Sequence, residues 1–259
     1  NCILQAACNA IRLGVGDGEV SNCAFSNIVI PESRTGISIV SRWTERAHIT
    51  HGATVEQVRF SNIIADVCMP FVIDVGPGAA RPGAIRDVSL SGLSLITSAG
   101  SQLVGSPEVP LERIRFSDVD WLVRGGTEDL SFAEKMPERP FRSGYSGVGG
   151  GPALPYVMYA THVEGLELEN VRVQWDSISR VWRDGFFIEN SNDVSLTGLR
   201  LRQPQDDDGA AVHSRANTGV TVRDCRADVG TGVFLRAEAS PAGSRIRCGG
   251  NDMADAREP

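Results

Sequence analysis

Lysine, aromatic side chains and long apolar runs are scarce in this sequence. Lys135 is the only lysine, aromatic residues make up 6% of the chain, and no apolar run reaches the roughly 18 residues of a membrane span. A membrane-spanning helix is therefore excluded. The first ten residues lack the basic and apolar regions of a signal peptide. A net charge of -7 speaks against the basic surface that binds nucleic acid.

Paired or densely spaced cysteines are also missing. The six cysteines occupy positions 2, 8, 23, 68, 225 and 248, without the C-x-x-C pair of a zinc or redox site. We expect most of them to be reduced core residues. His48 and His51 form an H-x-x-H, but no Cys or acidic partner has a suitable spacing, so we predict no metal and no cofactor.

What the sequence does contain is an internal repeat. Apolar residues alternate with polar ones in a nine-residue phrase, whose eighth residue is Asn, Asp or Gly. The clearest copies are residues 20–28, 55–63, 85–93, 111–119 and 163–171, and weaker copies end near residues 199, 225 and 251. A fixed repeat of this kind is typical of solenoids, in which each unit covers the core of its neighbour.

The spacing of the copies gives the repeat length. The equivalent positions 20, 55, 85, 111, 163, 191, 217 and 243 are separated by 35, 30, 26, 52, 28, 26 and 26 residues, and 52 is twice 26. Each unit also holds a second short alternating segment, such as residues 36–39 or 71–75. Alternation with a period of two indicates strands, and no window has the 3.6-residue period of a helix.

These features predict an all-β fold, a right-handed parallel β-helix of about nine turns of roughly 26 residues. A β-sandwich also has short strands, but its strands would not repeat one phrase at one period. Stacked turns explain why the same positions are apolar in every unit, and they place Cys23, Cys225 and Cys248 on the inward side. A bend with positive φ and a ladder of amides are expected at Asn27, Asn62, Asn170 and Asn251.

The two irregular places in the repeat are its start and one long interruption. Residues 1–4 match residues 27–30, so the chain opens within a turn, and we expect upstream turns or a partner to cover that end. Residues 124–154 are rich in Gly and Pro and are expected to form a loop insertion in a single domain spanning 1–259.

The repeat resembles that of a known enzyme family. Residues 36–39, 25–28 and 58–63, together with residues 154–166 after the loop, resemble turns of polygalacturonase-like glycosyl hydrolases of family 28, bacterial type. The resemblance covers nearly the whole chain as the C-terminal part of such an enzyme. It implies a polysaccharide or oligosaccharide as partner, a secreted or periplasmic location, and catalytic aspartates upstream of Asn1.

The residues that match the family's later motifs differ from them. Where the family has the histidine of its G-H-G motif, this chain has Asn9, and where the family has an R-I-K pair it has Ser38 and Val40. Neither Ser nor Val can pair with a sugar carboxylate, and Asn cannot exchange a proton as imidazole does. We therefore expect this chain by itself to be inactive on polygalacturonate.

One outward face is the expected place for sugar. The predicted register groups a set of polar residues there, with Trp43 nearby as a stacking platform. The candidate substrate-binding residues are Asn9, Arg12, Arg34, Ser38, Arg42 and Asp74. Asp74 is predicted on the strand position that also carries Arg12 and Ser38, with glycan binding through Arg12 and Asp74.

Other polar motifs have simpler interpretations. The acids at 206–208 are typical of a solvated turn, residues 147–152 lack the features of a phosphate loop, and His162 and His213 are interpreted as structural or solvated. The first functional hypothesis is part of a glycoside hydrolase. The alternatives are a glycan-binding, adhesin-like or tail-spike-like β-helix, and a polysaccharide lyase for which only Arg12 offers a suitable base.

Overall fold

The computed structural model describes residues 1–41, 51–75, 83–124, 154–176, 182–204, 209–239, 241–242 and 244–258. Within these ranges every regular element is a strand, and none is a helix that could cross a membrane. The strands are β1 (Cys2–Gly14), β2 (Glu19–Ser41), β3 (Thr54–Val75), β4 (Ile85–Thr97), β5 (Ser101–Val104), β6 (Leu111–Val123), β7 (Tyr156–Thr161), β8 (Val163–Trp175), β9 (Asp184–Glu189), β10 (Asn192–Thr197), β11 (Arg200–Leu201), β12 (Val212–Arg215), β13 (Thr218–Arg223), β14 (Arg226–Ala227), β15 (Thr231–Val233), β16 (Leu235–Glu238), β17 (Ile246–Gly249) and β18 (Ala256–Glu258).

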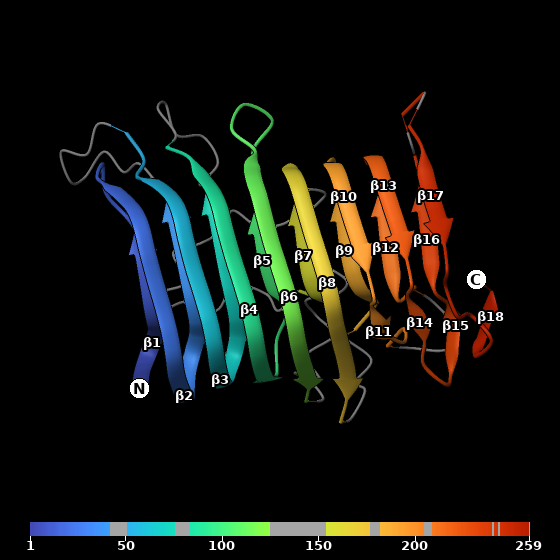
Figure 1. Cartoon of the computed structure of the whole chain (residues 1–259), viewed down its shortest axis with the longest axis horizontal. Helices are drawn as coiled ribbons and strands as arrows, with labels where there is room; N and C mark the ends of the chain where they lie inside the picture. The colour runs from blue at the N-terminus through green and yellow to red at the C-terminus, as the bar shows by residue number, and fades with distance from the viewer. Residues whose placement is uncertain are drawn as a thin grey trace.

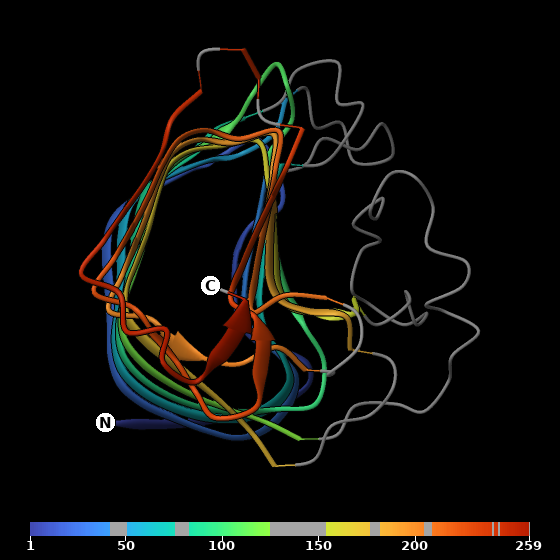
Figure 2. The same ribbon diagram turned by 90° about the vertical axis from the view of Figure 1, so that its right-hand side faces the viewer.

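Sixteen of the described strands form a curled sheet, β15 and β18 form a second small sheet, and neighbouring strands in both are parallel. One wall runs through β3, β4, β6, β8, β10, β13 and β17, and a second runs through β3, β5, β7, β9, β12 and β16. The long strands β1, β2 and β3 belong to both walls because each continues through the bends between them. Figure 1 shows the first wall side-on, and Figure 2 shows the walls surrounding a common interior.

The register of the first wall is that predicted from the repeat. Phe25 pairs with Phe60, Phe60 with Leu90, Leu90 with Phe116, and the later pairs continue in order. We call this set the inward column: Phe25, Phe60, Leu90, Phe116, Leu168, Leu196, Val222 and Cys248. From Phe60 to Val222 its members are buried in one continuous core, whereas Phe25 is half-buried. The predicted match of residues 2 and 3 with 28 and 29 is also confirmed.

The bends follow the Asn, Asp and Gly positions. Asn27, Asn62 and Asn170 have φ of 57°, 52° and 52°, and Asn62 Nδ2 donates to Asn27 Oδ1 at 2.6 Å. The prediction for Asn251 is wrong by one residue, because the positive φ belongs to Gly250. Asn251 instead accepts a hydrogen bond from the Cys225 amide at 2.9 Å and so joins two segments 26 residues apart.

The cysteine prediction is wrong for most of the residues. Cys225 is buried, but Cys8 and Cys23 are half-buried, and Cys2, Cys68 and Cys248 are exposed. Cys248 does occupy the inward column, yet β17 has β13 on one side and no described strand on the other, so its side chain stays uncovered. All six are free thiols.

Candidate functional site

The predicted face of Arg12 and Ser38 continues along the second wall. The pairing of successive strands lines up one outward residue from each of them. We call this set the outward column: Arg12, Ser38, Val72, Gln102, Tyr159, Phe187, His213 and Arg236. The residues on either side of each member point to the core, as the alternation of a strand requires.

Asp74 does not lie in the outward column, which corrects the predicted register. The offset between paired residues of β2 and β3 is 35 up to Ile30 (65 minus 30) and 34 from Ser33 onward (67 minus 33). A bulge in β2 causes this change, so Ser38 pairs with Val72 and Asp74 pairs with Val40. Asp74 therefore belongs to the adjacent column on the same face, which also carries Glu189, Arg215 and Glu238 further along.

The predicted sugar-binding residues fall into two groups by exposure. Ser38 and Asp74 are 1% and 0% exposed, so neither side chain is at the surface. Arg12 is exposed, and Asn9 and Arg34 are half-buried. Asn9 Nδ2 donates to the neighbouring Cys8 Sγ at 3.3 Å, and Asn9 pairs with Thr35 of β2 in the sheet. The structure thus does not gather these residues into one accessible site.

Several predictions fall on residues outside the described ranges. They are Arg42 and Trp43, His48 of the H-x-x-H, nearly all of the 124–154 loop, and the acids at 206–208. His51 is described and exposed. In the described part of the chain, no three His, Cys, Asp or Glu side chains are grouped so that they could hold a metal ion.

An aromatic and ionisable cluster lies at the other end of the outward column, on β7, β9 and β12. The rings of Tyr159 and Phe187 have centroids 5.7 Å apart, and the Phe187 ring is 4.6 Å from that of His213. Tyr156 lies 4.9 Å from Phe187 on the outer side of the sheet. Aromatic rings on successive strands therefore form a continuous apolar patch beside the imidazole.

The imidazole of His213 lies between two carboxylates. Its Nδ1 is 3.4 Å from Asp184 Oδ2, and its Nε2 is 3.3 Å from Glu238 Oε2. Asp184 also accepts a hydrogen bond from the Ala210 amide at 2.7 Å, which holds the carboxylate in place. The contact to Glu238 lacks hydrogen-bond geometry, so the buried Nε2 is left without a hydrogen bond. Glu238 is 48% exposed and His213 8% exposed.

A second buried carboxylate supports the cluster. Glu189 accepts hydrogen bonds from the Tyr159 hydroxyl and from Arg215 Nε, the latter at 2.8 Å. The Arg215 guanidinium covers the Phe187 ring at 4.9 Å from its centroid. Burial, and then the Glu189 carboxylate, raise the pKa of Tyr159, and burial raises the pKa of Tyr156 to about 12. Both tyrosines are therefore neutral donors at physiological pH.

This arrangement can bind hydroxyl groups. Buried ionisable groups are costly unless they are paired, and such clusters are concentrated at functional sites. Here Asp184 holds the ring at Nδ1, while the buried Nε2 lies beside Glu238, whose side chain is 48% exposed. With Nδ1 facing the Asp184 carboxylate as a donor, Nε2 is an acceptor like Glu238, so the two groups together take two hydroxyl donors, such as those on neighbouring carbons of a sugar.

Sequence analysis missed this cluster although the repeat contained the signal. His213 follows Phe187 by 26 residues, one repeat unit, and Phe187 follows Tyr159 by 28. Continuing the spacing from Arg12 and Ser38 along the chain would have put His213 on the expected sugar-binding face. The prediction of His213 as a structural or solvated residue far from the Arg12 end stays a prediction; the register adds that it lies on the same face.

Comparison with known proteins adds no assignment: no family model, no curated protein and no solved structure matches the chain.

Proposed function

We propose that this chain is part of a glycoside hydrolase with a right-handed parallel β-helix of about nine turns, and that its own role is to hold a polysaccharide. The observation that carries the proposal is the buried, unsatisfied Nε2 of His213 beside the half-exposed carboxylate of Glu238. Both groups are acceptors when Nδ1 donates to Asp184, and two neighbouring hydroxyls of one sugar supply a donor to each.

The regular pairing of the strands supports the fold part of the proposal. Val194 pairs with Val220 and Val220 with Ile246, each at an interval of 26 residues, in parallel register. A coil that repeats every 26 residues places equivalent side chains about 4.8 Å apart. Such a straight row suits an extended polymer better than a small ligand.

The chemistry of the cluster supports binding by this chain rather than cleavage. Glycoside hydrolysis needs one acid at the leaving oxygen and one carboxylate that activates water. Asp184 and Glu189 are 1% and 5% exposed and already engaged with Ala210, Tyr159 and Arg215. Glu238 alone of these carboxylates is open to a sugar, so the cluster lacks an accessible pair.

The second candidate is a glycan-binding β-helix without hydrolytic activity, of the adhesin or tail-spike kind. The same absence of an accessible acid–base pair among the described residues of the cluster favours it. The two candidates differ in what the complete gene product does. Release of reducing ends by that protein favours the hydrolase, whereas binding without release favours the module.

Binding to immobilised polysaccharides tests the proposal. In affinity electrophoresis, we expect a plant cell-wall polysaccharide to retard the chain, and expect Glu238→Gln to weaken the binding by about tenfold through loss of a charged hydrogen bond. Glu164→Gln removes the same charge from an exposed glutamate on the other wall and should change nothing. Equal binding by the chain and its Glu238→Gln variant would contradict the assigned contact.

A parallel reducing-sugar assay tests the role of the chain. We expect no turnover of polygalacturonate by the chain itself. Turnover that disappears in the His213→Asn variant would replace the binding role with a catalytic one.

A further inference from the structure

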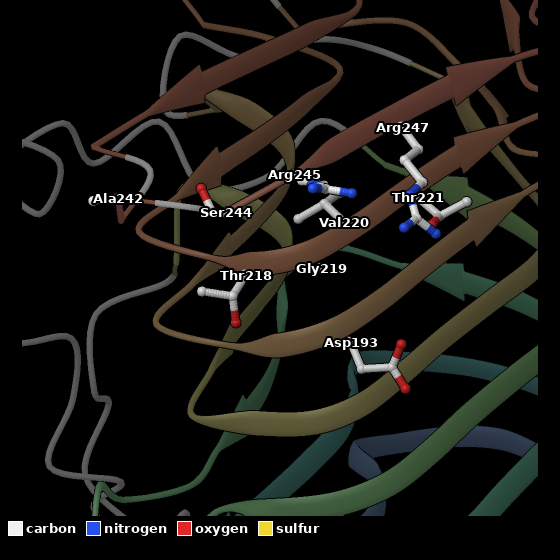
Figure 3. A pocket seen from close by; sticks show the side chains of 9 residues that line it. All are labelled: Asp193, Thr218, Gly219, Val220, Thr221, Ala242, Ser244, Arg245 and Arg247. Carbon is white, nitrogen blue, oxygen red and sulfur yellow. The ribbon is translucent and has the colours of Figure 1, made fainter.

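A hollow of about 430 Å³ lies on the outer face of the first wall, near its last strands. Figure 3 shows the hollow over β13 and β17, with Arg245 and Arg247 on one side and Asp193 on the other. It is separate from the His213 cluster, which lies on the second wall. The polar side chains that line it include Thr221, Ser244, Arg245, Arg247 and Asp193.

The alternation of β17 directs Arg247 outward, and Arg245, which directly precedes β17, lines the same hollow. Ile246 pairs with Val220 and Cys248 with Val222, and these residues face the interior. Arg247 pairs with Thr221, so its side chain and the threonine hydroxyl emerge on the same face. Arg245 and Arg247 are both exposed.

These two arginines differ from others on the same wall. Arg86 pairs with Glu56 at 2.6 Å, Arg113 with Asp87 at 2.6 Å, and Arg115 with Glu169. Neither Arg245 nor Arg247 makes an ion pair with a described residue. Asp193 is the single acidic residue lining the hollow, so two guanidinium groups face one carboxylate in a chain whose net charge is -7.

A larger hollow on the same wall provides an internal contrast. It measures about 780 Å³ and is lined by Arg59, Arg113 and Arg115, but also by Asp87 and Glu167. There Arg113 and Arg115 are already neutralised by carboxylates of neighbouring strands. Arg59 in this larger hollow also has no ion pair within the described part of the chain, but two carboxylates, Asp87 and Glu167, line it as well, whereas Arg245 and Arg247 share their hollow with one carboxylate, Asp193.

We propose that the Arg245–Arg247 hollow binds a tetrahedral oxyanion, a sulfate or phosphate ester group carried by a ligand. Each guanidinium offers five N–H donors in a planar fork that matches such oxygens in pairs. The Thr221 and Ser244 hydroxyls add donors from two further directions. A tetrahedral group with three or four acceptor oxygens uses donors arranged around it, whereas a planar carboxylate uses only two oxygens.

Equilibrium dialysis with labelled inorganic sulfate and labelled inorganic phosphate tests this site in the chain as it stands. We expect saturable binding of one anion per chain at constant ionic strength. Arg245→Gln and Arg247→Gln should each weaken it by about tenfold, as expected for loss of a charged hydrogen-bond donor. The tighter of the two anions identifies whether a sulfate or a phosphate ester is the better ligand.

Arg59→Gln is the matched control, because Arg59 is an exposed arginine of the same wall that makes no ion pair with a described residue. It should leave binding unchanged, and the circular dichroism spectra of all three variants should be the same, since the side chains are exposed. An equal loss of anion affinity in all three variants would show that the overall charge of the chain causes binding, and it would overturn the site. Acetate that competes as well as sulfate would overturn the assignment to a tetrahedral group.

Binding of sulfate or phosphate does not depend on the polysaccharide proposal. His213→Asn and Glu238→Gln should leave anion binding intact, because they change the second wall. Conversely, the Arg245 and Arg247 variants should keep their affinity for a neutral polysaccharide. The two proposals can therefore fail separately.

Discussion

The inward and outward columns obey different rules although both come from the same repeat. The inward column is apolar from Phe25 to Cys248, and its neighbours pair directly across parallel strands. The outward column contains Arg, Ser, Val, Gln, Tyr, Phe and His. Every inward residue must be apolar, because its side chain packs against the inward side chain of the next strand in one shared core. The outer side is free of that restriction, so its chemistry varies along the molecule.

The largest effect should come from the inward column. Phe60 is fully buried and stacks on Phe25 with ring centroids 5.0 Å apart. We expect Phe60→Ala to lower the free energy of unfolding by about 3–5 kcal/mol, since the neighbouring coils cannot fill the cavity. Chemical denaturation followed by circular dichroism measures it. Phe25→Ala removes the half-buried member of the same ring pair and should cost clearly less; equal losses would show that the column is not buried as described.

The second effect concerns a buried polar residue of the outer side. Asp184→Ala leaves the Ala210 amide and His213 Nδ1 without their acceptor. Unsatisfied buried donors cost about 1–3 kcal/mol each, so we expect a loss of that order in the free energy of unfolding. Asp176→Ala, at an exposed aspartate, is the control and should be nearly neutral. If both variants unfold alike, the His213 cluster does not stabilise the fold.

The difference between the columns also sets the limit of prediction from sequence. The repeat predicted the parallel strands, the inward column and the positive φ of Asn27 and Asn62, because the same packing and bend requirements recur in every repeat. The outward register was misplaced at Asp74, because the predicted match with Ser38 needs an offset of 36 (74 minus 38), whereas the strands pair there at an offset of 34 (74 minus 40). The pairing of Arg113 and the lack of pairing at Arg245 depend on carboxylates from neighbouring coils. Such ion pairs can be predicted only from the positions of the side chains, because the repeat period does not determine them.

The third effect separates the bends from both columns. Asn62 has a φ of 52° and its amide donates to Asn27. We expect Asn62→Ala to cost about 1–2 kcal/mol, because alanine pays a steric penalty in the left-handed region. Asn62→Gly relieves that penalty and loses only the exposed amide contact, as at Gly92, which has a φ of 61°. A glycine variant as unstable as the alanine variant would assign the stability to the amide ladder instead.

The smallest effect should be seen at His162, where the second wall ends in a bend. His162 has a φ of 51° and its Nδ1 lies 2.9 Å from the Thr161 hydroxyl. Desolvation lowers the pKa of His162 from its usual value of 6.5. The unfolded chain therefore takes up a proton first as the pH falls below 6.5, and the folded state loses stability until the folded pKa is passed. Asn190 occupies the next bend with a φ of 48°, so His162→Asn preserves the backbone while removing the titrating group. Denaturant midpoints at pH 7.5 and pH 5 should differ slightly less in this variant than in the parent chain, because the half-buried ring is screened by water. If the difference between the midpoints at the two pH values is larger in the variant than in the parent chain, another group causes the acid sensitivity. His162 then contributes only the backbone conformation of the bend.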